Sequence, residues 1–136
     1  MFRHVGIVVR DLEKMSKFYQ EVIGLDLMYD KIEEGDFLEY IVGKKDARAH
    51  IHKLGKNGNT IVELLRWDEI YESEYPKLFT HGVTHFALTV DNVEDTSSKT
   101  HLVIGYPKLS PDGRFKVVFC HDPEGNLIEL VECVSI

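Results

Sequence analysis

The chain has 136 residues, of which 43% are hydrophobic, so it is long enough for one domain with a real core and too short for two ordinary domains. Its 23 acidic and 16 basic residues give a net charge of −7, which argues against nucleic acid or an anionic membrane as the main partner. No apolar run approaches about 18 residues and no signal peptide precedes the first strand, so we expect a cytoplasmic protein.

The two cysteines, Cys120 and Cys133, both lie in apolar runs typical of strands. In a cytoplasmic protein, thiols of this kind stay reduced and pack as small hydrophobic side chains. We therefore predict two buried free thiols and no disulfide.

The first half of the chain predicts a strand, a helix and three further strands. His4 to Val9 is rich in Val and Ile, and Asp11 then caps a helix with one apolar face that ends at Gly24. The segments that follow are a strand (Leu25–Ile32), a polar turn (Glu33–Asp36), a short helical turn (Phe37–Val42), a strand (Arg48–Leu54), a hairpin turn at Asn57-Gly58 and a strand (Thr60–Trp67).

The second half repeats this order after a connector at residues 68–80, which has no Gly/Ser linker composition. Asn92 to Leu102 contains four Ser and Thr residues and predicts only a short helix. The remaining predictions are an irregular strand containing Pro107 (Tyr106–Leu109), a turn at Pro111-Asp112-Gly113, a strand (Phe115–Cys120), a hairpin turn (Asp122–Asn126) and a last strand (Leu127–Val134).

The chain contains an internal duplication. FRHVGIVVRDLE near the N-terminus corresponds to THFALTVDNVE, with His4 matching His85, and GNTIVELL corresponds to GNLIEL. Two modules, residues 1–67 and 81–136, therefore form a single domain over residues 1–136, and each module has the order βαβββ.

Each module offers one histidine on its first strand and one glutamate on its last: His4 and Glu63, then His85 and Glu129. A single strand histidine or glutamate is usually structural, but that explanation would have to hold four times at matched positions. If the modules pair about a pseudo-twofold axis, two imidazoles and two carboxylates converge. Such a set suits a divalent ion of intermediate softness, such as zinc, nickel, cobalt, manganese or iron.

The segments HVGIVVRDLEKMSKFYQEVIGL, TIVELL, GVTHFALTV and DPEGNLIELVE resemble the vicinal oxygen chelate superfamily. The superfamily includes glyoxalase I, methylmalonyl-CoA epimerase, extradiol dioxygenases and proteins of bleomycin and fosfomycin resistance. The resemblance implies an α+β fold in which paired βαβββ modules form a curved mixed sheet around a metal site. It also implies that His4, Glu63, His85 and Glu129 are the ligands, as in glyoxalase I.

The resemblance implies a lyase or isomerase that acts on a small substrate with vicinal oxygens through an enediolate. Glu129 is the first candidate for the base and Glu63 the second. The alternatives are an epimerase, whose relatives usually carry Gln in place of Glu63, a non-haem iron extradiol dioxygenase, and a small-molecule-binding protein of the resistance type. Relatives are commonly homodimers, so each site could be completed within one chain or between two.

The connector departs from the glyoxalase I pattern, and His50, His52 and Cys120 are not among the predicted metal ligands. The connector and first residues of the second module, DEIYESEYPKLFTHGVTH, match no glutathione-binding residues, so the sequence leaves the substrate open. His50 and His52 share a strand face, for which exposure to solvent is the favoured interpretation and a place in the pocket the alternative. Cys120 lacks a base at a recognisable spacing and is predicted to be a core residue.

Overall fold

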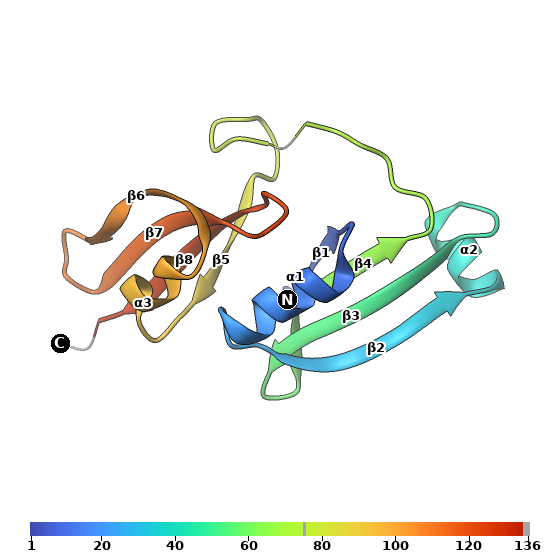
Figure 1. Cartoon of the computed structure of the whole chain (residues 1–136), viewed down its shortest axis with the longest axis horizontal. Helices are drawn as coiled ribbons and strands as arrows, with labels where there is room; N and C mark the ends of the chain where they lie inside the picture. Colours follow the sequence, from blue (N-terminus) through green and yellow to red (C-terminus); the bar gives the residue numbers. More distant parts are fainter. Residues whose placement is uncertain (75, 135–136) are drawn as a thin grey trace. The chain divides into compact units, whose positions relative to one another are not determined.

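The computed structural model describes residues 1–74 and 76–134. It divides into two compact units, Met1–Glu72 and Ser73–Ile136, and each contains one four-stranded mixed sheet (Figure 1). The first unit holds β1 (Val5–Val8), α1 (Leu12–Glu21), β2 (Asp26–Glu34), α2 (Asp36–Val42), β3 (Arg48–Lys56) and β4 (Asn59–Trp67). The second holds β5 (His85–Thr89), α3 (Val93–Ser98), β6 (His101–Leu109), β7 (Phe115–His121) and β8 (Leu127–Cys133).

In the first unit the strand order is β1-β4-β3-β2, with β1 parallel to β4 and the other neighbours antiparallel. Helix α1 packs across one face of this sheet, mainly against β3 and β4 (Figure 1). The core between them is fully buried and consists of apolar side chains from the helix (Leu12, Met15, Tyr19) and from the two strands (Leu54, Val62, Leu64).

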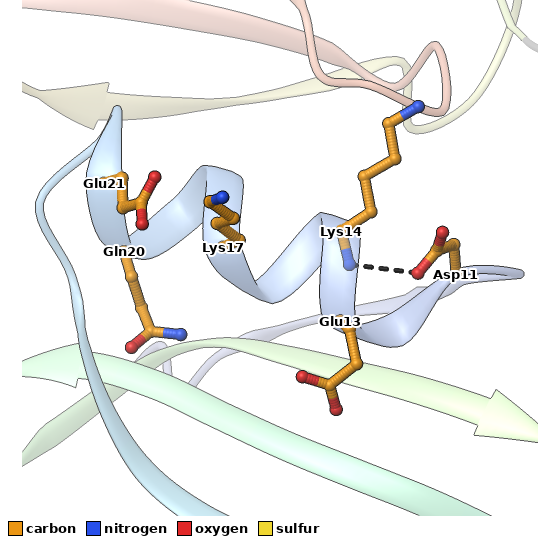
Figure 2. A pocket seen from close by; sticks show the side chains of 6 residues that line it. All are labelled: Asp11, Glu13, Lys14, Lys17, Gln20 and Glu21. Atoms are coloured by element: carbon orange, nitrogen blue, oxygen red, sulfur yellow. Dashed lines mark hydrogen bonds between the residues drawn. The ribbon is translucent and has the colours of Figure 1, made fainter.

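Both predicted helices of the first unit are present, although α1 ends at Glu21, before the predicted stop at Gly24, and α2 begins at Asp36, one residue before the predicted start. The Asp11 carboxylate accepts a hydrogen bond of 3.0 Å from the backbone N–H of Lys14, which satisfies one free donor of the first turn of α1 (Figure 2). The predicted helical turn at Phe37 is α2, and Gly43 follows it with φ +68°, as in a left-handed C-terminal cap.

The second unit repeats the topology, with strand order β5-β8-β7-β6, β5 parallel to β8, and α3 packed on one face. Each unit therefore has a βαβββ order, with α2 as an insertion in the first. The predicted fold class, α+β with paired βαβββ modules, is confirmed.

Several predicted element boundaries are wrong. The short helix predicted within Asn92–Leu102 ends at Ser98, and the second strand of that unit begins at His101 instead of Tyr106. The hydroxyls of Ser98 and Thr100 donate to the carbonyls of Asp95 and Ser97, and such local bonds compete with helix propagation. In the first unit, β2 continues through Glu34, where a turn was predicted from Glu33 onward.

The hairpin between β3 and β4 turns at Asn57 and Gly58, whose φ angles of 51° and 78° confirm the predicted Asn-Gly turn. Beyond the turn, Gly55 pairs with Thr60 but Leu54 pairs with Val62, so Ile61 is an extra residue in β4. A Cβ atom on Gly55 would lie 1.8 Å from the carbonyl oxygen of Asn59, so the close approach of the two strands at this bulge requires glycine.

The hairpin between β7 and β8 is organised by Asp122, which is 1% exposed. Its carboxylate accepts hydrogen bonds from the backbone N–H groups of Glu124 and Asn126, each 3.0 Å long, and from the Asn126 side-chain amide at 2.8 Å. These bonds set the entry of the chain into β8, the strand that carries Glu129.

Replacing Asp122 with Ala should lower the free energy of unfolding by about 3 kcal/mol, because several hydrogen-bond donors would lose a charged acceptor. Thermal denaturation should show a fall in Tm of roughly 10 °C. The matched control is Asp112→Ala, because Asp112 also accepts bonds in a turn, from Ser110 and from the backbone N–H of Arg114, but lies at an exposed position. Equal losses in the two variants would contradict the role of Asp122.

The cysteine predictions are half correct. Both thiols are free, and Cys120 is buried in β7, where burial raises the pKa of its thiol. Cys133 is exposed, contrary to prediction, because it is the last residue of β8. Within the described residues, none of the helices combines the length and apolarity that a membrane span requires.

Candidate functional site

In the first unit, His4 and Glu63 lie together on one face of the sheet. Glu63 pairs with Gly6 across the parallel strands β1 and β4, and His4 precedes Gly6 by two residues, so strand alternation puts both side chains on the same side. The Nε2 atom of His4 is 3.7 Å from Oε2 of Glu63. Both side chains are partly buried, with 28% and 16% of their surface exposed.

The second unit builds the same arrangement. Glu129 pairs with Ala87 across β5 and β8, His85 precedes Ala87 by two residues, and Nε2 of His85 is 3.5 Å from Oε2 of Glu129. The other ring nitrogen of His85, Nδ1, lies 2.9 Å from the Thr84 hydroxyl, and the ring edge meets Phe119 at 5.0 Å between centroids. When Nδ1 carries the proton and donates to Thr84, Nε2 keeps a free lone pair that can bind a cation.

Each pair has the chemistry of half a metal site. Neighbouring ligands on an ion with bonds of about 2.1 Å are roughly 3.0 to 3.4 Å apart, and the observed distances of 3.7 and 3.5 Å are close to that range. An imidazole nitrogen beside a carboxylate oxygen also suits the borderline divalent ions. The residues of each unit therefore fit the metal that the resemblance implies, while the union of both pairs on one ion remains a prediction.

Two residues beside Glu63 were missed in the sequence. Lys53 pairs with Glu63 across β3 and β4, and its ammonium nitrogen is 3.7 Å from Oε2 of Glu63. The same nitrogen lies 4.6 Å from the centre of the Tyr29 ring. The Tyr29 hydroxyl donates to Glu33 at 2.6 Å, and this bond raises the pKa of Tyr29. In the second unit, Phe119 pairs with Glu129 and occupies the position of Lys53.

Replacing Lys53 with Met should strengthen divalent cation binding by about fivefold, because the ammonium group competes with a cation for the Glu63 carboxylate at a partly exposed position. Titration with Mn²⁺ or Zn²⁺ measures the change. Lys31→Met is the matched control, since Lys31 also lies over the Tyr29 ring and the net charge changes equally. Weaker cation binding by the Lys53 variant would show that Lys53 supports the site instead.

The predicted solvent exposure of the histidine pair on β3 is wrong for His52, which is 2% exposed, whereas His50 is 31% exposed. His52 pairs with Leu64 and lies on the sheet face that α1 covers, because its Nε2 is 4.0 Å from the Glu13 carboxylate of that helix. It therefore faces away from Glu63, and a place beside His4 and Glu63 is also excluded.

A hollow on α1 is lined by charged and polar side chains (Figure 2). All of them belong to the helix or its cap: Asp11, Glu13, Lys14, Lys17, Gln20 and Glu21. Acidic and basic groups both line it, so no single charge would select a ligand. We therefore regard it as an ordinary solvated helix surface, although Glu13 points from it toward the sheet.

Comparison with known proteins identifies the family. The model of the Glyoxalase/Bleomycin resistance protein/Dioxygenase superfamily matches residues 2–130. The chain belongs to this superfamily. The resemblance seen in the sequence is therefore confirmed, and the superfamily contains enzymes as well as resistance proteins.

Individual proteins of the superfamily are similar to this chain over most of its length. A lactoylglutathione lyase of Schizosaccharomyces pombe is 28% identical over 94% of this chain, which spans 46% of that longer protein. A probable lactoylglutathione lyase of Synechocystis is 29% identical over 97% of this chain and 95% of its own length. Among solved structures, a glyoxalase family protein from Bacillus cereus has the same fold, with a TM-score of 0.86 at 21% identity, covering 98% of this chain and 94% of its own.

Proposed function

We propose that this protein is a divalent-metal-dependent lyase or isomerase of the glyoxalase I type, acting on a small substrate with two adjacent oxygens. The main support is the His–Glu pair at corresponding positions of the two units, with nitrogen–oxygen distances of 3.7 and 3.5 Å. Two relatives named as lactoylglutathione lyases, at 28% and 29% identity, support the same class of reaction.

In this proposal His4, Glu63, His85 and Glu129 hold one ion of zinc, nickel, cobalt, manganese or iron. The ion would supply positive charge to the two substrate oxygens as the neighbouring carbon becomes negative. The two imidazoles would bind the ion through Nε2, since in each unit this atom faces the carboxylate of the paired glutamate.

Glu129 is the proposed base, taking a proton from the substrate carbon at Oε2 and returning it to the adjacent carbon. The surroundings of the two glutamates support this choice. The ammonium nitrogen of Lys53 lies 3.7 Å from Oε2 of Glu63, whereas Ala87 and Phe119, which pair with Glu129 across the neighbouring strands, carry no charge. Glu63 is then a ligand first and a base only second.

Assay with a 2-oxoaldehyde and glutathione, in deuterated water, tests the proposed function. A lyase or isomerase should form the glutathione thioester of the corresponding 2-hydroxy acid, incorporate solvent deuterium at the carbon that receives the proton, and lose both activities on chelation of divalent ions. An epimerase would exchange deuterium on other substrates without forming this product. Binding of substrate with neither reaction would contradict the proposal and favour a binding protein of the resistance type.

We further propose a homodimer, as the resemblance implies. Mixing a His4→Ala chain with a His85→Ala chain identifies the source of the ligands. If each ion is held by two chains, mixed dimers regain one complete site and about half of the activity per dimer. If each ion is held within one chain, mixing restores nothing.

A further inference from the structure

A second group of metal-ligand side chains lies in the first unit, formed by Asp30 of β2 and by His50 and His52 of β3. The carboxylate oxygen Oδ1 of Asp30 is 2.5 Å from Nε2 of His50 and 3.2 Å from Nε2 of His52. One ligand atom from each residue lies within 4.8 Å of the other two. Two nitrogens and one oxygen at these separations are the donors of a transition-metal site.

His52 has no hydrogen bond that would explain its burial. Its side chain is 2% exposed, and in the part of the chain that the structure describes neither ring nitrogen has a hydrogen-bond partner. Nε2 is near the Asp30 oxygen, but its direction does not make a hydrogen bond. Buried polar atoms are rarely left in this state, so an additional partner for Nε2 is indicated.

Two β-bulges place this group on the opposite face of the sheet from His4 and Glu63. The extra residue in β4 makes Glu63 pair with Lys53. His52, which precedes Lys53 in β3, therefore faces the opposite side of the sheet, which α1 covers. In β2, Leu27 pairs with Leu54 but Tyr29 pairs with Lys53, so the extra residue Met28 turns Asp30 to the side of His52. The group is thus built on the opposite face of the same sheet.

We propose that Asp30, His50 and His52 bind a second divalent cation of the zinc type, separate from the ion assigned to His4, Glu63, His85 and Glu129. Ligands of a tetrahedral zinc are about 3.4 Å apart, close to the 3.2 Å between Asp30 and His52. On binding, the shorter distance between Asp30 and His50 lengthens as their direct bond is replaced. Glu13 of α1, 4.0 Å from Nε2 of His52, is placed to supply a fourth ligand.

The charge state of the group suits a cation. The hydrogen bond from His50 lowers the pKa of Asp30, so its carboxylate is ionised and ready to bind a metal at neutral pH. A cation there would join β2 to β3 and, through Glu13, to the N-terminal turn of α1. We therefore expect it to stabilise the first unit rather than to take part in the reaction.

The test uses the full chain with His4→Ala and His85→Ala, which removes two of the four residues assigned to the first ion. Equilibrium dialysis against Zn²⁺ with elemental analysis should give about one zinc per chain, and Zn²⁺ should raise the Tm. Adding His52→Ala should weaken zinc binding by about 100-fold or more, since a buried ligand is lost. Absence of zinc from the starting variant would overturn the proposal.

Asp30→Asn provides a second variant, because Asp30 is 52% exposed and its replacement leaves the core unchanged. We expect zinc affinity to fall by at least about tenfold and the zinc-dependent rise in Tm to shrink accordingly. His101→Ala removes an exposed histidine of β6 and should leave zinc binding unchanged. Equal zinc binding by the Asp30, His52 and His101 variants would show adventitious surface binding and overturn the proposal.

Discussion

Replacing Glu129 with Gln should lower turnover by about 1,000-fold while the divalent ion stays bound. A glutamine oxygen can still approach a cation, but the amide cannot take a proton from a carbon, and a positioned base contributes 100- to 10,000-fold. The position of Glu129 beside His85 and between two apolar neighbours is kept in the variant. Product formation, deuterium exchange and metal content measured on one preparation separate loss of the base from loss of the ion.

Two further substitutions control for this result. Glu132→Gln changes another glutamate of β8, one that accepts a hydrogen bond from the backbone N–H of Val93, and should leave turnover nearly unchanged. Glu63→Gln should reduce metal affinity more than it reduces the rate of the metal-loaded protein, because Glu63 is proposed as a ligand first and as a base only second. Full activity in the Glu129 variant would remove it from the mechanism.

Replacing either His4 or His85 with Ala should weaken binding of the first ion by about 100-fold or more, and turnover should fall with it. Each unit contributes only one imidazole and one carboxylate to the proposed site, so neither unit can hold the ion without the other. Loss of a ligand in one unit should therefore also release the ion from the ligands of the other unit. Denaturation curves should change little, since both histidines are partly exposed.

Because of the duplication, most of the fold could be predicted from the sequence. The His4 and His85 strands, the capping residues Asp11 and Asn92, and the turns at Asn57-Gly58 and Gly125-Asn126 all carry local signals that do not depend on distant contacts. The same repeat identified the two His–Glu pairs, because parallel pairing of the first and last strand of each module brings their side chains to one face.

The residues around these pairs could not be predicted because they depend on bulges. A regular hairpin about Asn57-Gly58 pairs residue 52 with residue 63, which would put His52 beside Glu63. The extra residue Ile61 shifts the register so that Lys53 takes that position, and Met28 does the same for Tyr29 and Asp30. A bulge requires one additional residue and has no strong sequence signal, yet it exchanges the two faces of a strand.

A cation titration shows whether His4, Glu63, His85 and Glu129 hold one common ion. Cobalt(II) would be titrated into the Asp30→Asn chain, in which the second proposed site is weakened, and into the same chain with His4→Ala or with His85→Ala. We expect one tightly bound ion per chain in the Asp30→Asn protein. In each histidine variant, both the bound ion and its visible spectrum should be lost. Two results would contradict a common ion. One is the binding of two independent ions, of which each variant loses one, and the other is retention of a single ion in either variant.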